Sequence, residues 1–222
     1  MAPSSRSSVV RGGAGPLAAA GSLGVLFAAI GFVGRIPAVV GAELGVDQFL
    51  AAHERTPALT GFVLGVADTA VPSRVGLVAI VLVPAAFLLA RRRGAALRAL
   101  GVLAGAMTAA TVIKRLVDQP RPPAALWAVP AHGASFPSGH TTTATAVVVA
   151  VLLGLAGVRR VLTCVVGTAW VSAVGFSRLY LAHHFLHDVL GAVVLVVATG
   201  FLVVAVSTAV RRSAAAAPAA PF

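Results

Sequence analysis

Residues able to bind and cleave a phosphate ester gather at three places in the second half of the chain. The first is Lys114, followed by Arg121 and Pro122. Both cations border apolar runs, where a charge is costly unless it meets an anion, and the arginine fork matches phosphate oxygens. The pair therefore predicts an anion site, although such side chains also commonly extend to a membrane surface.

The second place is Pro137-Ser138-Gly139-His140, which opens an apolar run. At a helix N-terminus, free N–H groups and the positive end of the helix dipole would face outward beside a serine hydroxyl and an imidazole. The tetrapeptide predicts an anion-binding nest with an attached proton donor. Simple N-capping by Ser138 is the alternative interpretation.

The third place is Ser177-Arg178, followed by His184 and Asp188. Residues four apart on a helix share one face, so Asp188 can accept the proton of one imidazole nitrogen. The other nitrogen of His184 is then left as a nucleophilic lone pair. This spacing predicts a histidine nucleophile with a carboxylate that orients it.

The elements that position these residues must lie in a membrane. Of the 222 residues, 59% are apolar and only 10% are charged, and the mean hydropathy is +0.97. A water-solvated surface does not tolerate this composition. We therefore expect an all-α, polytopic membrane protein with six transmembrane helices in a bundle and the active site at the outer membrane face.

Six apolar runs are long enough to cross a hydrocarbon core of about 30 Å. The stretch Thr56–Ala67 is too short and is expected to be interfacial or re-entrant. The membrane domain would cover residues 16–212, between disordered tails at 1–15 and 213–222. An arginine-containing start before an apolar run also fits a cleaved signal peptide. The expected spans are Leu17–Val40, Ser73–Ala90, Leu97–Ile113, Thr141–Val158, Val161–Phe176 and Val189–Val210.

Charge is divided between the two predicted membrane faces. One face carries the termini and ten arginines, and the other carries all six acidic residues and all six histidines. The positive-inside rule then predicts cytoplasmic termini and a catalytic face on the outside. The net charge of +11 is thus explained by topology and does not indicate nucleic-acid binding. A single cysteine, Cys164, excludes an intrachain disulfide.

Taken together, the motifs resemble the three-part signature of the type 2 phosphatidic acid phosphatase (PAP2) superfamily. That signature is Lys-x6-Arg-Pro, Pro-Ser-Gly-His and Ser-Arg-x5-His-x3-Asp, and this chain matches it at every position, within a resemblance spanning roughly Leu97–Val210. The resemblance implies that His184 attacks phosphorus to form a phosphohistidine, that Asp188 orients it, and that His140 protonates the leaving group. It also implies phosphoryl-oxygen ligands at Lys114, Arg121, Ser138, Gly139 and Arg178.

No metal or cofactor is expected, because three cationic side chains can stabilise the charge that Mg²⁺ stabilises elsewhere. The expected partners are the bilayer and a lipid phosphate: phosphatidate, undecaprenyl diphosphate or phosphatidylglycerophosphate. Transfer of the phosphoryl group to another acceptor is the main alternative. A vanadate-dependent haloperoxidase shares the motifs but is soluble, and a transporter would place its charges near the midplane. The substrate and the oligomeric state stay open.

Overall fold

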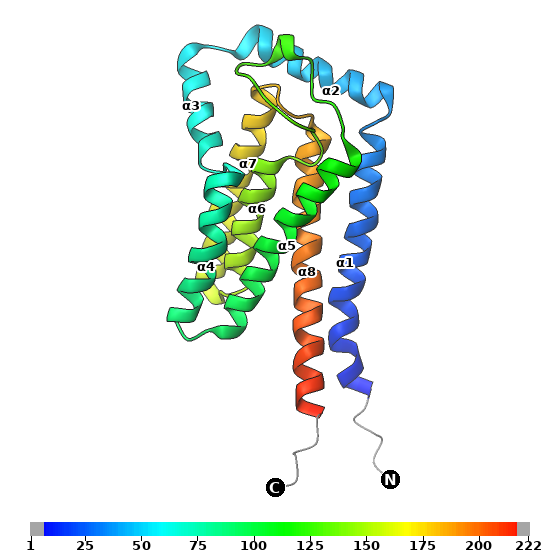
Figure 1. Cartoon of the computed structure of the whole chain (residues 1–222), viewed down its shortest axis with the longest axis vertical. Helices are drawn as coiled ribbons and strands as arrows, with labels where there is room; N and C mark the ends of the chain where they lie inside the picture. Colours follow the sequence, from blue (N-terminus) through cyan, green and yellow to red (C-terminus); the bar gives the residue numbers. More distant parts are fainter. Residues whose placement is uncertain (1–6, 217–222) are drawn as a thin grey trace.

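Long helices run side by side in this protein, and one short helix lies across one end of them (Figure 1). The computed structural model describes residues 7–216, which contain eight α-helices and no strand. The elements are α1 (Ser7–Val33), α2 (Pro37–Phe49), η1 (Leu50–Glu54), α3 (Pro57–Asp68), η2 (Pro72–Gly76), α4 (Leu77–Leu89), α5 (Arg93–Val117), η3 (Ala124–Leu126), α6 (Gly139–Leu152), α7 (Gly157–Tyr180) and α8 (Leu186–Ala216).

The all-helical membrane architecture is confirmed, but the count of six spans is not. Within residues 7–216, five stretches are long and apolar enough to cross a bilayer. One of them joins α3, the expected interfacial piece, to α4. Helix α6 is apolar but has only 14 residues, fewer than the roughly 20 that a span needs. The five stretches are Gly15–Val33, Pro57–Leu89, Arg93–Val117, Gly157–Tyr180 and Leu186–Ala216.

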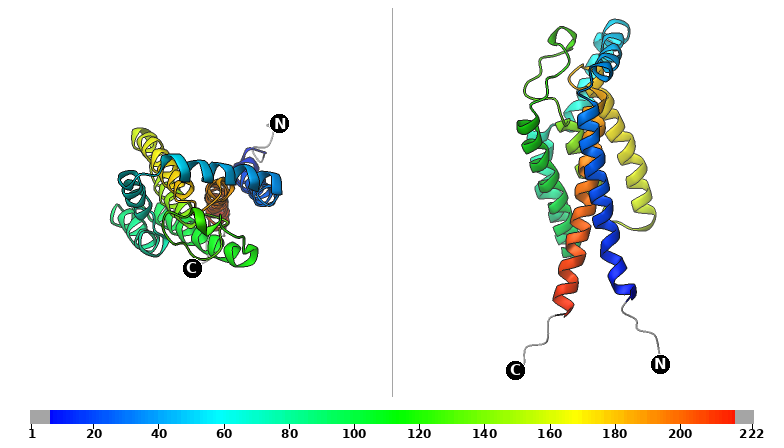
Figure 2. Two further views of the ribbon diagram at one scale, coloured as in Figure 1. Left: turned by 90° about the horizontal axis from the view of Figure 1, so that it is seen from above. Right: turned by 90° about the vertical axis from the view of Figure 1, so that its right-hand side faces the viewer.

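The first expected span, Leu17–Val40, is interrupted. Helix α1 ends at Val33 and α2 begins at Pro37. Proline has no N–H to continue a helix and pushes the preceding residue into an extended conformation, and Ile36 has φ −71° and ψ 123°. The chain therefore turns, and α2 crosses the end of the bundle at a steep angle to α1 (Figures 1 and 2).

Helices extend into both segments that were expected to be disordered tails. Helix α1 begins at Ser7 and α8 ends at Ala216, so parts of 1–15 and 213–222 are helical. Alanine has the highest helix propensity, which explains the extension of α8 through its alanine-rich end. The remaining tail residues, 1–6 and 217–222, lie outside the described part of the chain.

Small residues allow the central helices to approach closely. Ala99 and Ala106 of α5 and Ala146 of α6 are fully buried and pack in one apolar cluster with Val196 of α8. Close contact between small side chains is the usual basis of helix packing in lipid. Helix α1 runs along α8, and both views of the bundle show this pair (Figures 1 and 2). Large exposed apolar side chains cover the outer surface of the bundle, as contact with lipid requires.

Candidate active site

The three motifs meet at the end of the bundle that lies opposite to the C-terminal end of α8. Lys114 lies in the last turn of α5, His140 in the first turn of α6, and Arg178 in the last turn of α7. Because successive helices run in alternating directions, these turns come together at one end. Four of the predicted site residues line a shared cavity of about 290 Å³: Arg121, His140, Arg178 and His184.

The predicted nucleophile and its orienting carboxylate form a buried pair. His184 Nδ1 lies 3.2 Å from Asp188 Oδ2, and neither side chain is more than 3% exposed. The same carboxylate oxygen accepts hydrogen bonds from the backbone N–H of Phe185, at 2.9 Å, and from the Ser135 hydroxyl. With Nδ1 directed at Asp188, the proton is assigned to Nδ1 and the lone pair to Nε2.

The spacing predicted that His184 and Asp188 lie on one helix, but His184 lies outside α8. It stands in the turn that joins α7 to α8, three residues after the α7 C-cap at Leu181 and two before α8 begins at Leu186. Ala182 in this turn has φ +51°, which reverses the chain and brings the next residues back over the helix ends. The i, i+4 pair forms nonetheless, because Asp188 occupies the first turn of α8.

Burial keeps the His184 imidazole neutral. Desolvation lowers the pKa of His184 to about 3; Asp188 opposes the shift, while Arg121 and Lys114 contribute to it. A histidine with this pKa carries no proton on Nε2 at pH 7 and so retains a nucleophilic lone pair. His183, in the same turn, has its pKa lowered to about 4, chiefly by burial, and its Nε2 lies 2.8 Å from the carbonyl of Val129.

Arg121 is fixed beside His184 by backbone carbonyls. Its Nε donates to Gly133 and its Nη2 to His132, each at 2.9 Å, while its Nη1 donates to the carbonyl of His183 at 2.5 Å. The same Nη1 lies 3.1 Å from His184 Nε2. Arg121 is therefore anchored on one side by carbonyl groups, and on the other side it presents positive charge to Nε2 of His184.

Arg178 has an incompletely satisfied guanidinium group. The side chain is only 3% exposed and lines the cavity, and its Nε donates to Ser177 Oγ at 3.1 Å. Within residues 7–216, its Nη2 atom is buried and has no hydrogen-bond partner. A buried, unpaired guanidinium nitrogen is costly unless an anion completes its hydrogen bonding.

Lys114 does not line this cavity. Its Nζ donates to the carbonyls of Ala134 and Ser135, at 2.7 and 2.9 Å. Together with Gly139 it instead borders a neighbouring cavity of about 160 Å³. Lys114 thus holds the loop that carries Ser135 against the helix ends. It also contributes positive charge near His184 without lining the cavity.

Ser138 caps helix α6. Its side chain is fully buried, and its Oγ lies 3.5 Å from the N–H of Thr141 and 3.1 Å from the Thr141 hydroxyl. The backbone N–H of Ser138 donates to the carbonyl of Asp188 at 3.0 Å. Of the two interpretations of the tetrapeptide, capping is thus present, and the N-terminus of α6 is tied directly to α8.

Sequence reasoning missed three polar contributions to the site. Ser135 is fully buried and donates to Asp188, but it belongs to none of the motifs. Asp68, at the end of α3, lines the same cavity as the motif residues. Arg55 donates to the carbonyls of Tyr180 and Leu126 and so joins the η1 segment to the site. No spacing rule indicates such long-range contacts.

His187 also has a defined place next to the site, although it belongs to none of the motifs. It is buried, and its ring contacts Glu43 of α2, Gln119 and Asp188. No group of three His, Cys, Asp or Glu side chains in the described part of the chain is arranged to hold a metal ion.

Comparisons with known proteins agree with this geometry. The model of the PAP2 superfamily matches residues 95–212, more than half of the chain and all three motifs. The structure is similar to the crystal structure of a transmembrane PAP2-type phosphatidylglycerolphosphate phosphatase from Bacillus subtilis, with a TM-score of 0.73 and 27% sequence identity. The match covers 83% of this chain and 93% of that chain. A search of curated proteins gave no significant match.

Proposed function

Because this chain belongs to the PAP2 superfamily and is a membrane phosphatase, we propose that it hydrolyses a lipid phosphate ester or diphosphate through a phosphohistidine on His184. The observation that carries the proposal is the His184–Asp188 pair at 3.2 Å, with the unprotonated Nε2 at the cavity, 3.1 Å from Arg121 Nη1. A neutral imidazole oriented by a carboxylate and facing cations is suited to attack on phosphorus.

In the first step, His184 Nε2 attacks the phosphorus atom and the bond between phosphorus and the leaving oxygen breaks. Burial, and then Arg178, lower the pKa of His140 to about 3, so His140, which lines the same cavity, would take up a proton together with the anionic substrate and donate it to that oxygen. The dephosphorylated lipid, or the lipid monophosphate where the substrate is a diphosphate, then departs. In the second step, His140 accepts a proton from water, whose oxygen attacks the phosphohistidine and releases inorganic phosphate.

Positive charge in the cavity would stabilise the transition state. Phosphoryl transfer depends on in-line placement and electrostatic stabilisation more than on covalent assistance. The unpaired Nη2 of Arg178 is the donor best placed for a phosphoryl oxygen. Arg121, whose Nη1 already contacts the His183 carbonyl and His184 Nε2, would contribute positive charge beside this donor. Lys114, Ser138 and the backbone of Gly139 would contribute charge and helix-dipole stabilisation from the adjoining wall.

The substrate class is a lipid whose phosphate reaches the end of the bundle while its chains stay in the bilayer. Phosphatidate, undecaprenyl diphosphate and phosphatidylglycerophosphate all meet this description. The similar Bacillus subtilis protein is a phosphatidylglycerolphosphate phosphatase, which favours the third lipid. We further propose that the termini are cytoplasmic and the cavity opens at the outer face, because eight arginines of the described chain lie toward the other end: Arg91, Arg92, Arg93, Arg98, Arg159, Arg160, Arg211 and Arg212.

Phosphate release by the purified protein, in detergent and with a chelator, tests this function. The three lipids would be compared side by side for the parent protein, for His184→Ala and for His53→Ala, an exposed histidine outside the cavity. We expect release by the parent and by His53→Ala, and at least a 10³-fold loss in His184→Ala, roughly the cost of removing a covalent nucleophile. Equal release by folded His184→Ala would overturn the mechanism, and no release from any lipid would favour transfer to another acceptor.

A further inference from the structure

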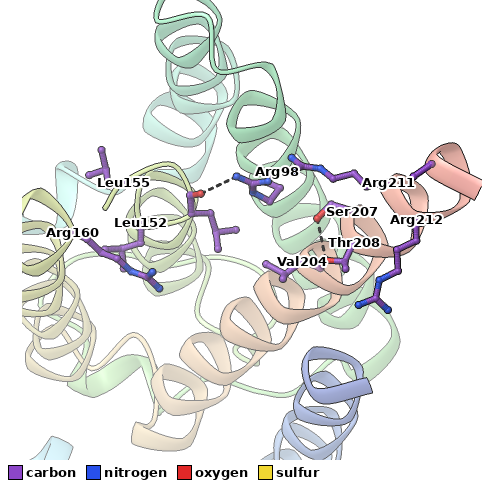
Figure 3. A pocket seen from close by; sticks show the side chains of 11 residues that line it. Arg98, Leu152, Leu155, Arg160, Val204, Ser207, Thr208, Arg211 and Arg212 are labelled. Carbon is purple, nitrogen blue, oxygen red and sulfur yellow. Dashed lines mark hydrogen bonds between the residues drawn. The ribbon is translucent and has the colours of Figure 1, made fainter. Parts of the chain in front are cut away.

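A second basic cavity lies at the end of the bundle opposite to the candidate active site (Figure 3). It has a volume of about 570 Å³ and is formed by α5, α8, the end of α6 and the start of α7. Four arginines line it: Arg98, Arg160, Arg211 and Arg212. No motif includes these residues, and the proposed chemistry does not use them.

Two of the four arginines, Arg98 and Arg211, lie close to Gly94. Arg98 donates to the carbonyl of Leu153 at 3.2 Å, and Arg211 extends toward it from α8 (Figure 3). Gly94 lies between them: a Cβ atom there would clash with Arg211 Nη2 and would stand 3.6 Å from Arg98 Nη1. Because Gly94 has no side chain, the guanidinium groups of Arg98 and Arg211 can both lie beside it, although their like charges repel.

No acidic side chain lies near this cluster in residues 7–216. All six acidic residues of the sequence lie toward the other end of the bundle: Glu43 and Asp47 in α2, Glu54 in η1, Asp68 at the end of α3, Asp118 after α5, and Asp188 in the first turn of α8. In the described part of the chain, none of the cavity-lining residues is acidic. No side chain of the described residues therefore neutralises the four arginines.

An apolar groove continues from the basic cavity along the outside of the bundle. The groove, of about 480 Å³, runs between α5 and α8 and shares Arg98, Ser207 and Arg211 with the cavity. Leu97 and Val206, both more than half exposed, form its walls, and Gly101 lines it from α5. A charged cavity joined to an apolar groove matches a molecule with an anionic head and a hydrocarbon chain.

We propose that this combined site binds an anionic phospholipid, with its phosphate over the arginines and one acyl chain along the α5–α8 groove. Arginine binds phosphate in a bidentate manner, and basic pockets between transmembrane helices hold anionic headgroups. Occupation of the site joins α5 to α8 at the end remote from catalysis. A free anion would satisfy the arginines but would leave the adjoining groove unused, so the lipid is the occupant that accounts for both features.

A photoreactive phosphatidylglycerol with a diazirine in its acyl chain tests the proposal on the full-length protein in nanodiscs. We expect crosslinks on peptides of α5 and α8 around Leu97 and Val206, competed by phosphatidylglycerol but not by phosphatidylcholine or inorganic phosphate. The double variant Arg160→Gln/Arg211→Gln should bind about 30-fold more weakly, since each arginine near an anionic lipid contributes about fivefold.

A matched control has the same charge change at the same end. Arg93→Gln/Arg159→Gln removes two exposed arginines that do not line the cavity or the groove, and it should bind within about twofold of the parent. An equal loss in both double variants would reduce the effect to general surface charge and overturn the site. Equal competition by phosphatidylcholine, or competition by inorganic phosphate, would also overturn it. The readout is binding, so the result does not depend on the proposed hydrolysis.

Discussion

Glu43 of α2 binds His187 at the start of α8 through both of its carboxylate oxygens. Oε1 accepts the backbone N–H of His187 at 3.0 Å, and Oε2 lies 2.5 Å from its Nδ1. The helix that crosses the bundle end is thereby joined to the helix that carries Asp188. A carboxylate near a helix N-terminus is also favoured by the helix dipole.

Replacing Glu43 by alanine should destabilise the protein. The change leaves a buried N–H and a buried imidazole nitrogen without their acceptor, which costs roughly 2–3 kcal/mol. Thermal unfolding in detergent would show a lower midpoint for Glu43→Ala than for Glu54→Ala, whose side chain is exposed. Equal midpoints would mean that the contact between α2 and α8 contributes nothing to stability.

Asp188→Asn should reduce kcat while leaving KM nearly unchanged. An asparagine oxygen in place of Oδ2 can still accept from Phe185, Ser135 and His184, but it is neutral, so it holds the imidazole less firmly and does not stabilise the positive charge that His184 gains on attack. We expect a loss of about 10²-fold or more in phosphate release. Ser135→Ala, which removes one hydrogen bond but keeps the carboxylate, should lose far less, and a similar loss in both would argue against an orienting role.

The part of this site that the motifs form could be predicted from the sequence, and the contacts made by backbone carbonyls could not. The meeting of Arg121, His140, Arg178 and His184 follows from motifs at the ends of alternating helices. The same argument placed Lys114 in the site, yet its ammonium group binds two loop carbonyls instead. Backbone acceptors compete for a lysine within reach, and no spacing rule counts them.

The tertiary contacts above the site could not be predicted. The break between α1 and α2 was hidden inside an apolar run, although Pro37 gives its cause. Once α2 turns across the bundle, Glu43 reaches a histidine 144 residues away. The turn at Ala182, with φ +51°, could not be predicted either, because alanine rarely adopts a positive φ.

The titration of His184 should be displaced far below that of an ordinary histidine. Its pKa is lowered to about 3, so the folded protein binds no proton there between pH 3 and 6.5 while the unfolded chain does. Stability from this group therefore rises with pH across that window. In NMR spectra of protein with ¹⁵N-labelled imidazoles, the His184 signal can be assigned because it is missing from the His184→Gln variant. Its chemical shift should remain that of a neutral imidazole down to about pH 4.5. Protonation with a midpoint near 6.5 would contradict this.

Asp47 should have the opposite effect on stability. Burial raises its pKa to about 7, with a smaller contribution from Glu43, and the side chain is 1% exposed. The folded state therefore holds a proton that the unfolded state releases above its ordinary pKa of 3.8, and stability from this group is lost as pH rises from about 4 to 7.

Asp47→Asn should consequently match the parent at pH 3 and exceed it at pH 8, by roughly 1–4 kcal/mol of unfolding free energy. The amide retains the shape of the protonated acid and never ionises. Denaturation midpoints at both pH values measure the difference. Asp118→Asn is the matched control, because Asp118 is exposed and asparagine tolerates its φ of +41°. A parallel shift of both variants would show that the gain comes from net charge and not from the burial of Asp47.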